Sequence, residues 1–232
     1  MDRLVEPELL DSLPAKAPEA IQSRGDLRRV NGWMGQVGIL HRALRNLPPA
    51  APRHVVELGA GDGTFLLRLA ARWPAREARI TAVLVDRQDL VSSETRRAFA
   101  VLGWEVQVVQ ADVFDWFARP GPTADWMLMN LFLHHFPTER LRRLLALAAA
   151  RTHVFAACEP RRAVLPLAAT RLLRLIGCNA ITRFDARVSV RAGFNHGELS
   201  ALWPSEDSWQ LREGPAGLFS HCLVARRKGG PL

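Results

Sequence analysis

A glycine-rich segment beside a carboxylate is the stretch of this 232-residue chain whose residue types point most directly to chemistry. Residues 55–64 read VVELGAGDGT, with glycines at the first, third and fifth positions after an apolar run. Such glycines let the backbone turn tightly and approach a ligand closely, and a following helix points its amides at that ligand. A dinucleotide-binding loop needs a glycine at the sixth position, which Thr64 occupies here. Glu57 suits a cationic amino group, so the segment favours a ligand with an amino group over one with two phosphates.

Two adjacent histidines follow another apolar run and could supply a base. Residues 127–137 read MLMNLFLHHFP. In open α/β sheets the site lies beyond the carboxyl ends of the strands, so this segment is expected to face the ligand. A neutral histidine, with an ordinary pKa near ~6.5, is suited to take a proton from a hydroxyl group. His134 or His135 is therefore a candidate base, although a histidine pair can equally order its own loop. Asn130 is expected to hold the ligand or this loop.

Alternating strands and helices must position these residues. Short apolar runs joined by helical patterns predict a parallel sheet covered on both faces. Two last strands, separated by Gly214, Pro215 and Gly217, predict a closing hairpin. The expected fold class is α/β, a Rossmann-like doubly wound, mostly parallel seven-stranded sheet with an antiparallel C-terminal hairpin. The expected strands are 54–58, 80–85, 106–109, 126–132, 154–157, 209–213 and 218–225, with helices ending near 73, covering about 89–102 and running from 138 to about 150.

The acid-x-G-x-G-x-G order of residues 57–63 and the acids that follow it resemble class I S-adenosylmethionine-dependent methyltransferases. The similarity covers roughly residues 54–160 by motif and extends to the C-terminal hairpin by element order. It implies S-adenosyl-L-methionine as cofactor, with Asp86 on the ribose hydroxyls and Asp112 on the adenine amino group. A carboxylate offers the paired acceptors that two adjacent hydroxyls need. The cofactor-binding residues implied by the resemblance are Glu57, Gly59, Ala60, Gly61, Gly63, Asp86, Arg87, Asp112, Val113 and Asn130.

The LHHF segment after the fourth strand is similar to that of small-molecule methyltransferases. Amino-directed nucleic-acid methyltransferases carry an Asn/Asp-Pro-Pro-aromatic motif there, base-carbon methyltransferases use a Pro-Cys pair, and this sequence has neither. We therefore expect methyl transfer to the oxygen, or secondarily the carbon, of a phenol-, quinone- or lipid-like acceptor. The alternatives are an NAD-type oxidoreductase and a methyltransferase-like binding or scaffold subunit without turnover. Nucleic-acid methylation is the weakest alternative.

An amphipathic helix is predicted ahead of the first strand. Ser23 and Asp26 resemble a helix start, in which a capping residue is followed three positions later by an acid. Apolar residues between Leu27 and Leu44 keep the spacing of a helix. Prolines at positions 7, 14 and 18 predict a loosely ordered beginning of the chain. The helix could help to form an acceptor pocket or only pack on the sheet.

The region after the fifth strand departs from the alternation of short apolar strands and helices. Residues 164–176 predict an apolar helix punctuated by arginines, followed by a polar stretch through Arg191. Asn195 with Glu198 predicts another capped helix that ends before Pro204. An apolar cover with arginines suits an acidic, phenolic or lipid-like acceptor, but it could equally rest on a membrane surface or a second subunit. We expect one domain, residues 1–232, made of an N-terminal helical cap (1–50), a cofactor-binding core (54–160), an acceptor-site insertion (161–204) and a closing hairpin (205–232).

Composition limits the partners and the compartment. The net charge of +8 favours anionic ligands, but the arginines are scattered through predicted helices, so no nucleic-acid partner is expected. The three cysteines are far apart in the sequence and form no CxxC pair, which indicates neither a metal site nor a disulfide framework. No window reaches the ~18 apolar residues of a membrane-spanning helix, and the acidic, proline-broken beginning is no signal peptide. We expect a cytoplasmic monomer or homodimer with a small-molecule acceptor, and peripheral membrane contact stays open.

Overall fold

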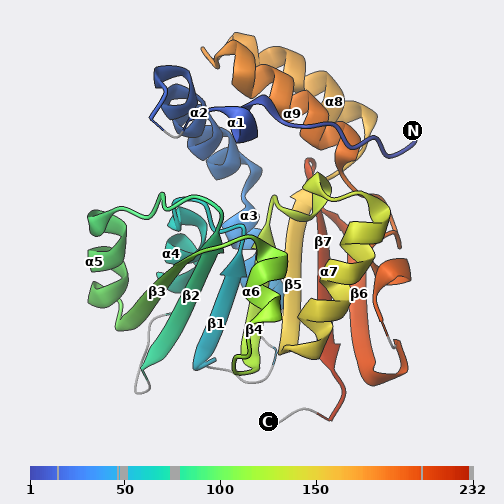
Figure 1. The fold of residues 1–232 in the computed structure, drawn as a ribbon. Helices are drawn as coiled ribbons and strands as arrows, with labels where there is room; N and C mark the ends of the chain where they lie inside the picture. The colour runs from blue at the N-terminus through green and yellow to red at the C-terminus, as the bar shows by residue number, and fades with distance from the viewer. Residues whose placement is uncertain (15, 46, 48–51, 74–78, 205, 230–232) are drawn as a thin grey trace.

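A seven-stranded sheet forms the centre of the molecule (Figure 1). The structure, a computed structural model, describes residues 1–14, 16–45, 47, 52–73, 79–204 and 206–229. The strand order is β3-β2-β1-β4-β5-β7-β6, with β1 to β5 parallel and β7 antiparallel to both of its neighbours. This confirms the predicted fold class. The strands are β1 (His54–Leu58), β2 (Ile80–Asp86), β3 (Trp104–Gln110), β4 (Ala124–Asn130), β5 (Thr152–Pro160), β6 (Trp209–Ala216) and β7 (Ser220–Arg227).

The C-terminal hairpin is longer than predicted. Gly214 and Pro215, which were expected in the turn, continue β6 and pair with Cys222 and His221 of β7. Proline is tolerated here because β6 is the edge strand of the sheet, where a missing N–H need not break a ladder. The turn itself lies around Gly217, whose φ of 74° is left-handed.

Apolar side chains form one core on each face of the sheet. Successive residues of β1 alternate between them, so that Val55 joins one core and Val56 the other. Helices α3 (Gln36–Leu44), α4 (Thr64–Ala70) and α5 (Ser93–Val101) contribute to the core that contains Val55. Helices α6 (Val113–Ala118) and α7 (Thr138–Ala150) contribute to the other. Burial on both faces explains the continuous apolar runs of the central strands.

The predicted N-terminal helix consists of two helices. Helix α2 (Pro18–Met34) ends at Gly35, whose φ of 68° breaks the helical path before α3 begins. Pro18 opens α2 at a position where its missing N–H costs nothing. The prediction of a helix start at Ser23 and Asp26 was wrong, because both are buried within α2.

The side chains of Ser23 and Asp26 bind helix α9 (Ala180–Ala192) instead. The Ser23 and Thr182 hydroxyls lie 2.8 Å apart, and Asp26 accepts the Asn179 amide at 2.8 Å. These buried polar contacts tie the N-terminal part of the chain to the region after β5, about 150 residues later in the sequence. A local capping pattern in the sequence could not distinguish this long-range use of the same residue types.

The region after β5 is more helical than predicted. Helix α8 (Val164–Ala169) runs into the 3-10 helix η2 (Thr170–Arg174) where one helix over 164–176 was expected, and α9 occupies the stretch taken as polar. The helix expected at Asn195 is a 3-10 turn, η3 (Ser200–Leu202), although Glu198 does accept the Asn195 amide at 2.8 Å. Three further short elements are α1 (Leu9–Ser12), η1 (Leu133–His135) and η4 (Glu206–Ser208).

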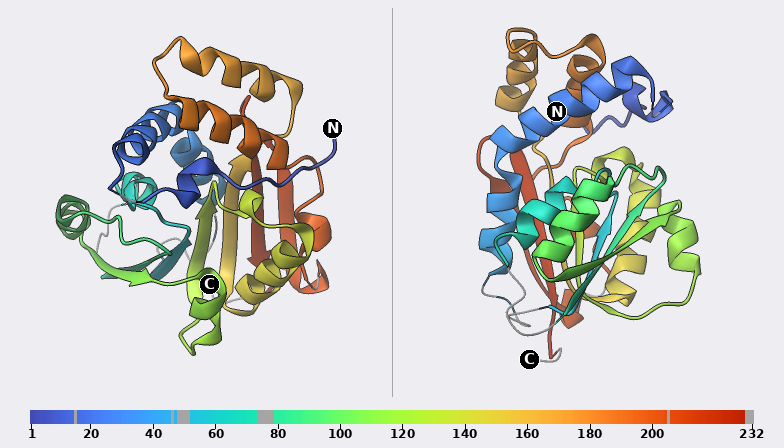
Figure 2. Two further views of the ribbon diagram at one scale, coloured as in Figure 1. Left: turned by 45° about the horizontal axis from the view of Figure 1, so that its top comes forward. Right: turned by 90° about the vertical axis from the view of Figure 1, so that its left-hand side faces the viewer.

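Helices α1, α2, α8 and α9 gather beyond the carboxyl ends of the parallel strands (Figures 1 and 2). They come from the N-terminal part of the chain and from the region after β5, and form a cap over the edge where β1, β2 and β4 end. Among the described helices, none combines the length and the apolar composition needed to cross a bilayer.

The backbone of Gly193, directly after α9, approaches β5 closely enough to test this arrangement. A Cβ built on Gly193 would lie 2.3 Å from the carbonyl oxygen of Pro160. We expect Gly193→Ala to lower the free energy of unfolding by about 1–3 kcal/mol through overpacking, measured by urea denaturation. Gly25→Ala, on α2 with its nearest neighbour at 3.9 Å, is the matched control and should raise stability by up to about 1 kcal/mol. Equal effects of the two substitutions would contradict the close approach.

Candidate active site

A cavity of about 550 Å³ lies between the carboxyl ends of the central strands and the helices of the cap. Its size is typical of small-molecule sites. The loops after β1, β2 and β4 form its floor, and α2, α8 and η2 contribute its roof. The residues predicted from the sequence that line it are Glu57, Gly59, Ala60, Gly61, Asp86, Arg87, Asn130, His134 and His135.

The glycine loop after β1 borders open space on its cavity side. A Cβ on Gly59 would lie 2.2 Å from the Phe132 ring, so this glycine lets the loops after β1 and β4 meet. A Cβ on Gly61 would meet no atom within 4 Å. Both glycines have left-handed φ angles, 71° and 54°. Asp86 at the end of β2 accepts the Gly61 amide at 2.9 Å and so holds the loop in place.

Three buried polar atoms in the cavity wall lack a hydrogen-bond partner among the described residues. They are Gln36 Nε2, Glu57 Oε2 and Asn130 Oδ1. The Asn130 amide donates to Gln36 Oε1 at 3.3 Å, which links two of these side chains. Burial, together with the charges of Asp62 and Asp86, raises the pKa of Glu57 well above its usual range. Such atoms are costly when unpaired, and this set would be satisfied by a ligand that carries an ammonium and a carboxylate group.

Three of the predicted cofactor residues do not line the cavity. Asp112 accepts the Phe114 amide at 2.8 Å and caps α6. Val113 is buried in the core, and a Cβ on Gly63 would lie 2.9 Å from Leu84. In this structure Asp112, Val113 and Gly63 therefore shape the elements beside the cavity, and a contact of theirs with a ligand stays a prediction.

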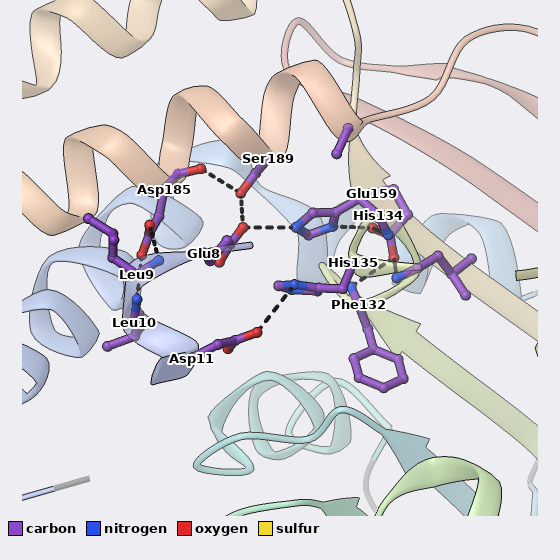
Figure 3. Close-up of polar contacts among 12 residues, drawn as sticks. Glu8, Leu9, Leu10, Asp11, Phe132, His134, His135, Glu159, Asp185 and Ser189 are labelled. Carbon is purple, nitrogen blue, oxygen red and sulfur yellow. Dashed lines mark hydrogen bonds and ion pairs between the residues drawn. The ribbon is translucent and has the colours of Figure 1, made fainter. Parts of the chain in front are cut away.

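His134 is held from both sides by carboxylates (Figure 3). Its Nδ1 lies 2.7 Å from Glu159 Oε2, and its Nε2 lies 3.3 Å from Glu8 Oε1. Glu159, at the end of β5, also accepts the amides of Phe132 and Leu133 at 2.9 Å. Burial alone would lower the pKa of His134, but the hydrogen bonds to the two carboxylates raise it to about 9. The imidazole is therefore protonated at neutral pH.

Glu8 was not found by sequence reasoning. Its carboxylate accepts from His134 and from the Ser189 hydroxyl of α9. Burial favours its neutral form, but the hydrogen bond and charge of His134 outweigh burial and lower the pKa of Glu8 to about 2. An acidic residue beside Pro7 near the start of a chain has no local pattern that marks it as part of a site.

His135 faces the same cluster, and its nearest carboxylate partner is Asp11 of α1. Its Nδ1 lies 3.6 Å from Asp11 Oδ2, and its side chain is 25% exposed. Burial, and then the positive charge of His134, lowers the pKa of His135 below the usual value of 6.5. At neutral pH His134 is therefore protonated and the adjacent His135 is neutral.

The first twelve residues, here called the N-terminal strap, run past α9 to α1 (Figure 1), and Glu8, Leu10 and Asp11 of the strap line this end of the cavity. Arg3 donates to the carbonyl oxygens of Ala192 and Phe136 at 2.8 and 2.9 Å. Asp185 of α9 accepts the amides of Leu9 and Leu10 at 2.8 and 3.1 Å. Sequence analysis expected a loosely ordered beginning because of its prolines, and these contacts, all to residues more than 130 positions away, order it.

Glu8, His134 and His135 also bring potential metal ligands within 4.8 Å of one another. We interpret the cluster as a hydrogen-bonded network because both nitrogens of His134 already lie against carboxylates. Such contacts leave His134 protonated, and a protonated imidazole offers no lone pair to a metal.

Comparison with known proteins agrees with this geometry. Residues 55–153 match the family model of a methyltransferase domain. A stretch of 93 residues is 34% identical to trans-aconitate 2-methyltransferase of Paracidovorax citrulli; it covers 40% of this chain but only 33% of that protein. The chain thus matches about a third of the length of this curated relative.

Solved structures share the fold over nearly the whole chain. The plantazolicin methyltransferase BpumL, solved with SAH, has a TM-score of 0.68 at 11% identity, with 92% of each chain covered. The mitomycin 7-O-methyltransferase MmcR has a TM-score of 0.60 at 17% identity, with 94% of this chain and 60% of that chain covered. The glycine loop and its strand-end acids thus lie in a stretch that matches a methyltransferase domain, and the chain has the fold of solved S-adenosylmethionine-dependent methyltransferases.

Proposed function

We propose that this protein transfers the methyl group of S-adenosyl-L-methionine to a hydroxyl oxygen of a small phenol-, quinone- or lipid-like acceptor. The observation that carries the proposal is one continuous cavity. It joins the unpartnered polar atoms of Gln36, Glu57 and Asn130 to the neutral His135. A cofactor site and a base thus border the same space, as an in-line transfer requires.

The residues present fit the amino-acid end of the cofactor. Glu57 and Asn130 offer oxygen acceptors to an ammonium group, and Gln36 offers an amide donor to a carboxylate. A cation beside Glu57 would also stabilise the ionised form of this buried carboxyl group, which burial otherwise disfavours. We assign the ribose hydroxyls to Asp86 and the remaining cofactor contacts to the residues named from the sequence, including Arg87 and Asp112.

The chemistry supplied by the bound cofactor is an electrophilic methyl group on a sulfonium. The chain must position the acceptor, exclude water and receive the hydroxyl proton. We assign the proton to His135, because its lowered pKa keeps it neutral near pH 7. His134, protonated between Glu159 and Glu8, is a positioning residue rather than a base. The strap and the roof would exclude water.

The acceptor end of the cavity is apolar. Leu172, Leu173 and Ile176 line it from the region after β5, and Met34 lines it from α2. These walls suit an apolar body, and MmcR, a relative by fold, methylates an oxygen according to its name. We therefore assign the acceptor site to the helical cap (1–50) and the insertion (161–204), and the cofactor site to the core (54–160).

We also propose a cytoplasmic protein that needs no nucleic-acid partner. Cys158 and Cys222 lie opposite each other on β5 and β7, yet both are free thiols. Free thiols at facing positions fit a reducing compartment.

The proposed function is tested by titration calorimetry and a methyl-transfer assay. We expect S-adenosylhomocysteine to bind and NADH not to bind, and the methyl group to appear on phenols of a panel that varies in apolar tail length. Binding of NADH alone would indicate an oxidoreductase. S-adenosylhomocysteine binding without transfer to any acceptor would indicate a binding or scaffold subunit.

Asp86→Asn tests the cofactor site. The substitution removes a charged acceptor for both the Gly61 amide and the ligand, a bond worth about 1.5–3 kcal/mol. We expect S-adenosylhomocysteine to bind at least about tenfold more weakly. The control is Asp89→Asn, whose carboxylate lies in an exposed pair with Arg96. An unchanged affinity in Asp86→Asn would mean that the cofactor binds elsewhere.

His135→Asn tests the base. We expect turnover to fall by about 100-fold or more while the affinity for S-adenosylhomocysteine changes little. In the unchanged protein the rate should rise with pH, and the midpoint of this rise should lie below pH 6.5, because the pKa of His135 is lowered. His134→Gln should reduce turnover and shift this inflection to higher pH, because it removes the positive charge that helps to lower the pKa of His135. Exposed His196→Asn is the control. A normal rate in His135→Asn at neutral pH, where the imidazole of the unchanged protein is neutral, would exclude His135 as the base.

His134 makes stability depend on pH. Its folded pKa of about 9 exceeds the ordinary 6.5, so its contribution is complete below pH 6.5 and disappears as the pH rises through about 9. At about 1.4 kcal/mol for each pKa unit, the loss is at most about 3–4 kcal/mol. Urea unfolding of the unchanged protein and of His134→Gln measures it as the difference between the two pH profiles. Parallel profiles would contradict the buried ion pairs.

A further inference from the structure

The segment from α8 through η2 to Leu175, here called the roof segment, is apolar on two opposite sides. Pro166, Ala169 and Leu173 line the cavity on its inner side. Figure 2 shows the segment on the outer side of α9, as the outermost layer of the cap. A helical segment with apolar residues all round is normally covered on both sides.

The outer side of the roof segment exposes large apolar residues. Val164 is 77% exposed, Leu165 54% and Leu175 80%, and none of the three lines the cavity. Leu172 lines the cavity and is still 59% exposed. Exposure, and not α-helical spacing, defines this side, because α8 passes into a 3-10 helix at Thr170. Four such side chains within twelve residues form a patch rather than scattered exposed residues.

The charge of this patch is uniformly positive. Arg171 and Arg174 lie exposed on the same stretch, and neither forms an ion pair with any residue that the structure describes. The sequence contains no Asp or Glu between Glu159 and Asp185. The outer side of the roof segment therefore offers apolar contact and unneutralised positive charge together.

This combination selects among the possible partners. In a two-fold contact with a second copy, the same surface would face itself, and the arginines of the two copies would come together. An anionic lipid surface instead places negative head groups beside the arginines and lets apolar side chains enter the interface. We propose that the outer side of the roof segment docks on membranes that contain anionic phospholipids.

The docking would place the roof of the cavity against the lipid. Under the proposed function this gives a lipid-like acceptor a short path from the bilayer to the site. The docking itself needs neither cofactor nor acceptor, so it can be tested independently of methyl transfer.

Co-sedimentation with vesicles tests the proposal on the full chain. We expect binding to phosphatidylcholine vesicles with about one third phosphatidylglycerol to be at least about tenfold tighter than to phosphatidylcholine alone, and to weaken with added salt. Leu165→Ser/Leu175→Ser and Arg171→Gln/Arg174→Gln should each weaken binding by about tenfold or more. The substituted leucines lie outside the cavity lining, so S-adenosylhomocysteine binding serves as a check of folding.

Matched controls come from α5, on another part of the molecule. Val101→Ser removes an apolar residue that is 86% exposed, and Arg96→Gln/Arg97→Gln removes the same charge as the arginine variant. Neither should change vesicle binding more than about twofold.

No binding to anionic vesicles, or equal effects of the roof and control variants, would overturn the proposal. A dimer in size-exclusion chromatography that the leucine variant abolishes would assign the patch to a second copy instead. If the unchanged protein bound anionic vesicles but did not bind S-adenosylhomocysteine, the proposed function alone would be refuted.

Discussion

The carboxylate of Glu159 is the group on which the arrangement of the site depends. It is fully buried at the end of β5 and accepts the amides of Phe132 and Leu133 as well as His134 Nδ1. Burying a carboxylate is costly unless every lone pair is used. The loop after β4 therefore has to wrap around Glu159, and this brings both histidines to the cavity. Through His134 the same network continues to Glu8, so that the first residues of the chain are drawn over the site.

At the cavity wall beside β1, in contrast, buried polar groups are left without partners among the described residues. Gln36, Glu57 and Asn130 keep atoms unpaired among the described residues, and Leu131 between the strand and the histidines has a left-handed φ of 54°. Unpaired groups and strained residues lower stability and are typical of functional sites. The satisfied network around Glu159 and the unsatisfied wall around Glu57 are joined by the loop after β4. The polar groups of the first are paired within the protein, and those of the second have atoms free to bind a ligand.

The cap explains how a common sheet acquires a closed cavity. Its helices come from the N-terminal part of the chain and from the region after β5, and they are held together by polar contacts such as Ser23 with Thr182 and Asp26 with Asn179. Polar contacts between helices have directional requirements that apolar packing lacks, so they specify one placement of α2 on α9. The roof segment, which follows β5 and is attached to this pair, then closes the cavity with its inner side and leaves its apolar outer side to another surface.

The sequence by itself determined the sheet, its order of elements and the cofactor loop. These follow from local rules: apolar runs of strand length, glycines where φ must be positive, and acids at strand ends. The tertiary structure alone decided which histidine is charged and what Ser23, Asp26 and Glu8 do. A pKa depends on burial and on neighbours in space, and the carboxylates that hold His134 lie 25 and 126 residues away. The roof segment shows the same limit, because periodicity identified its apolar residues but only the fold separated those that line the cavity from those that face outward.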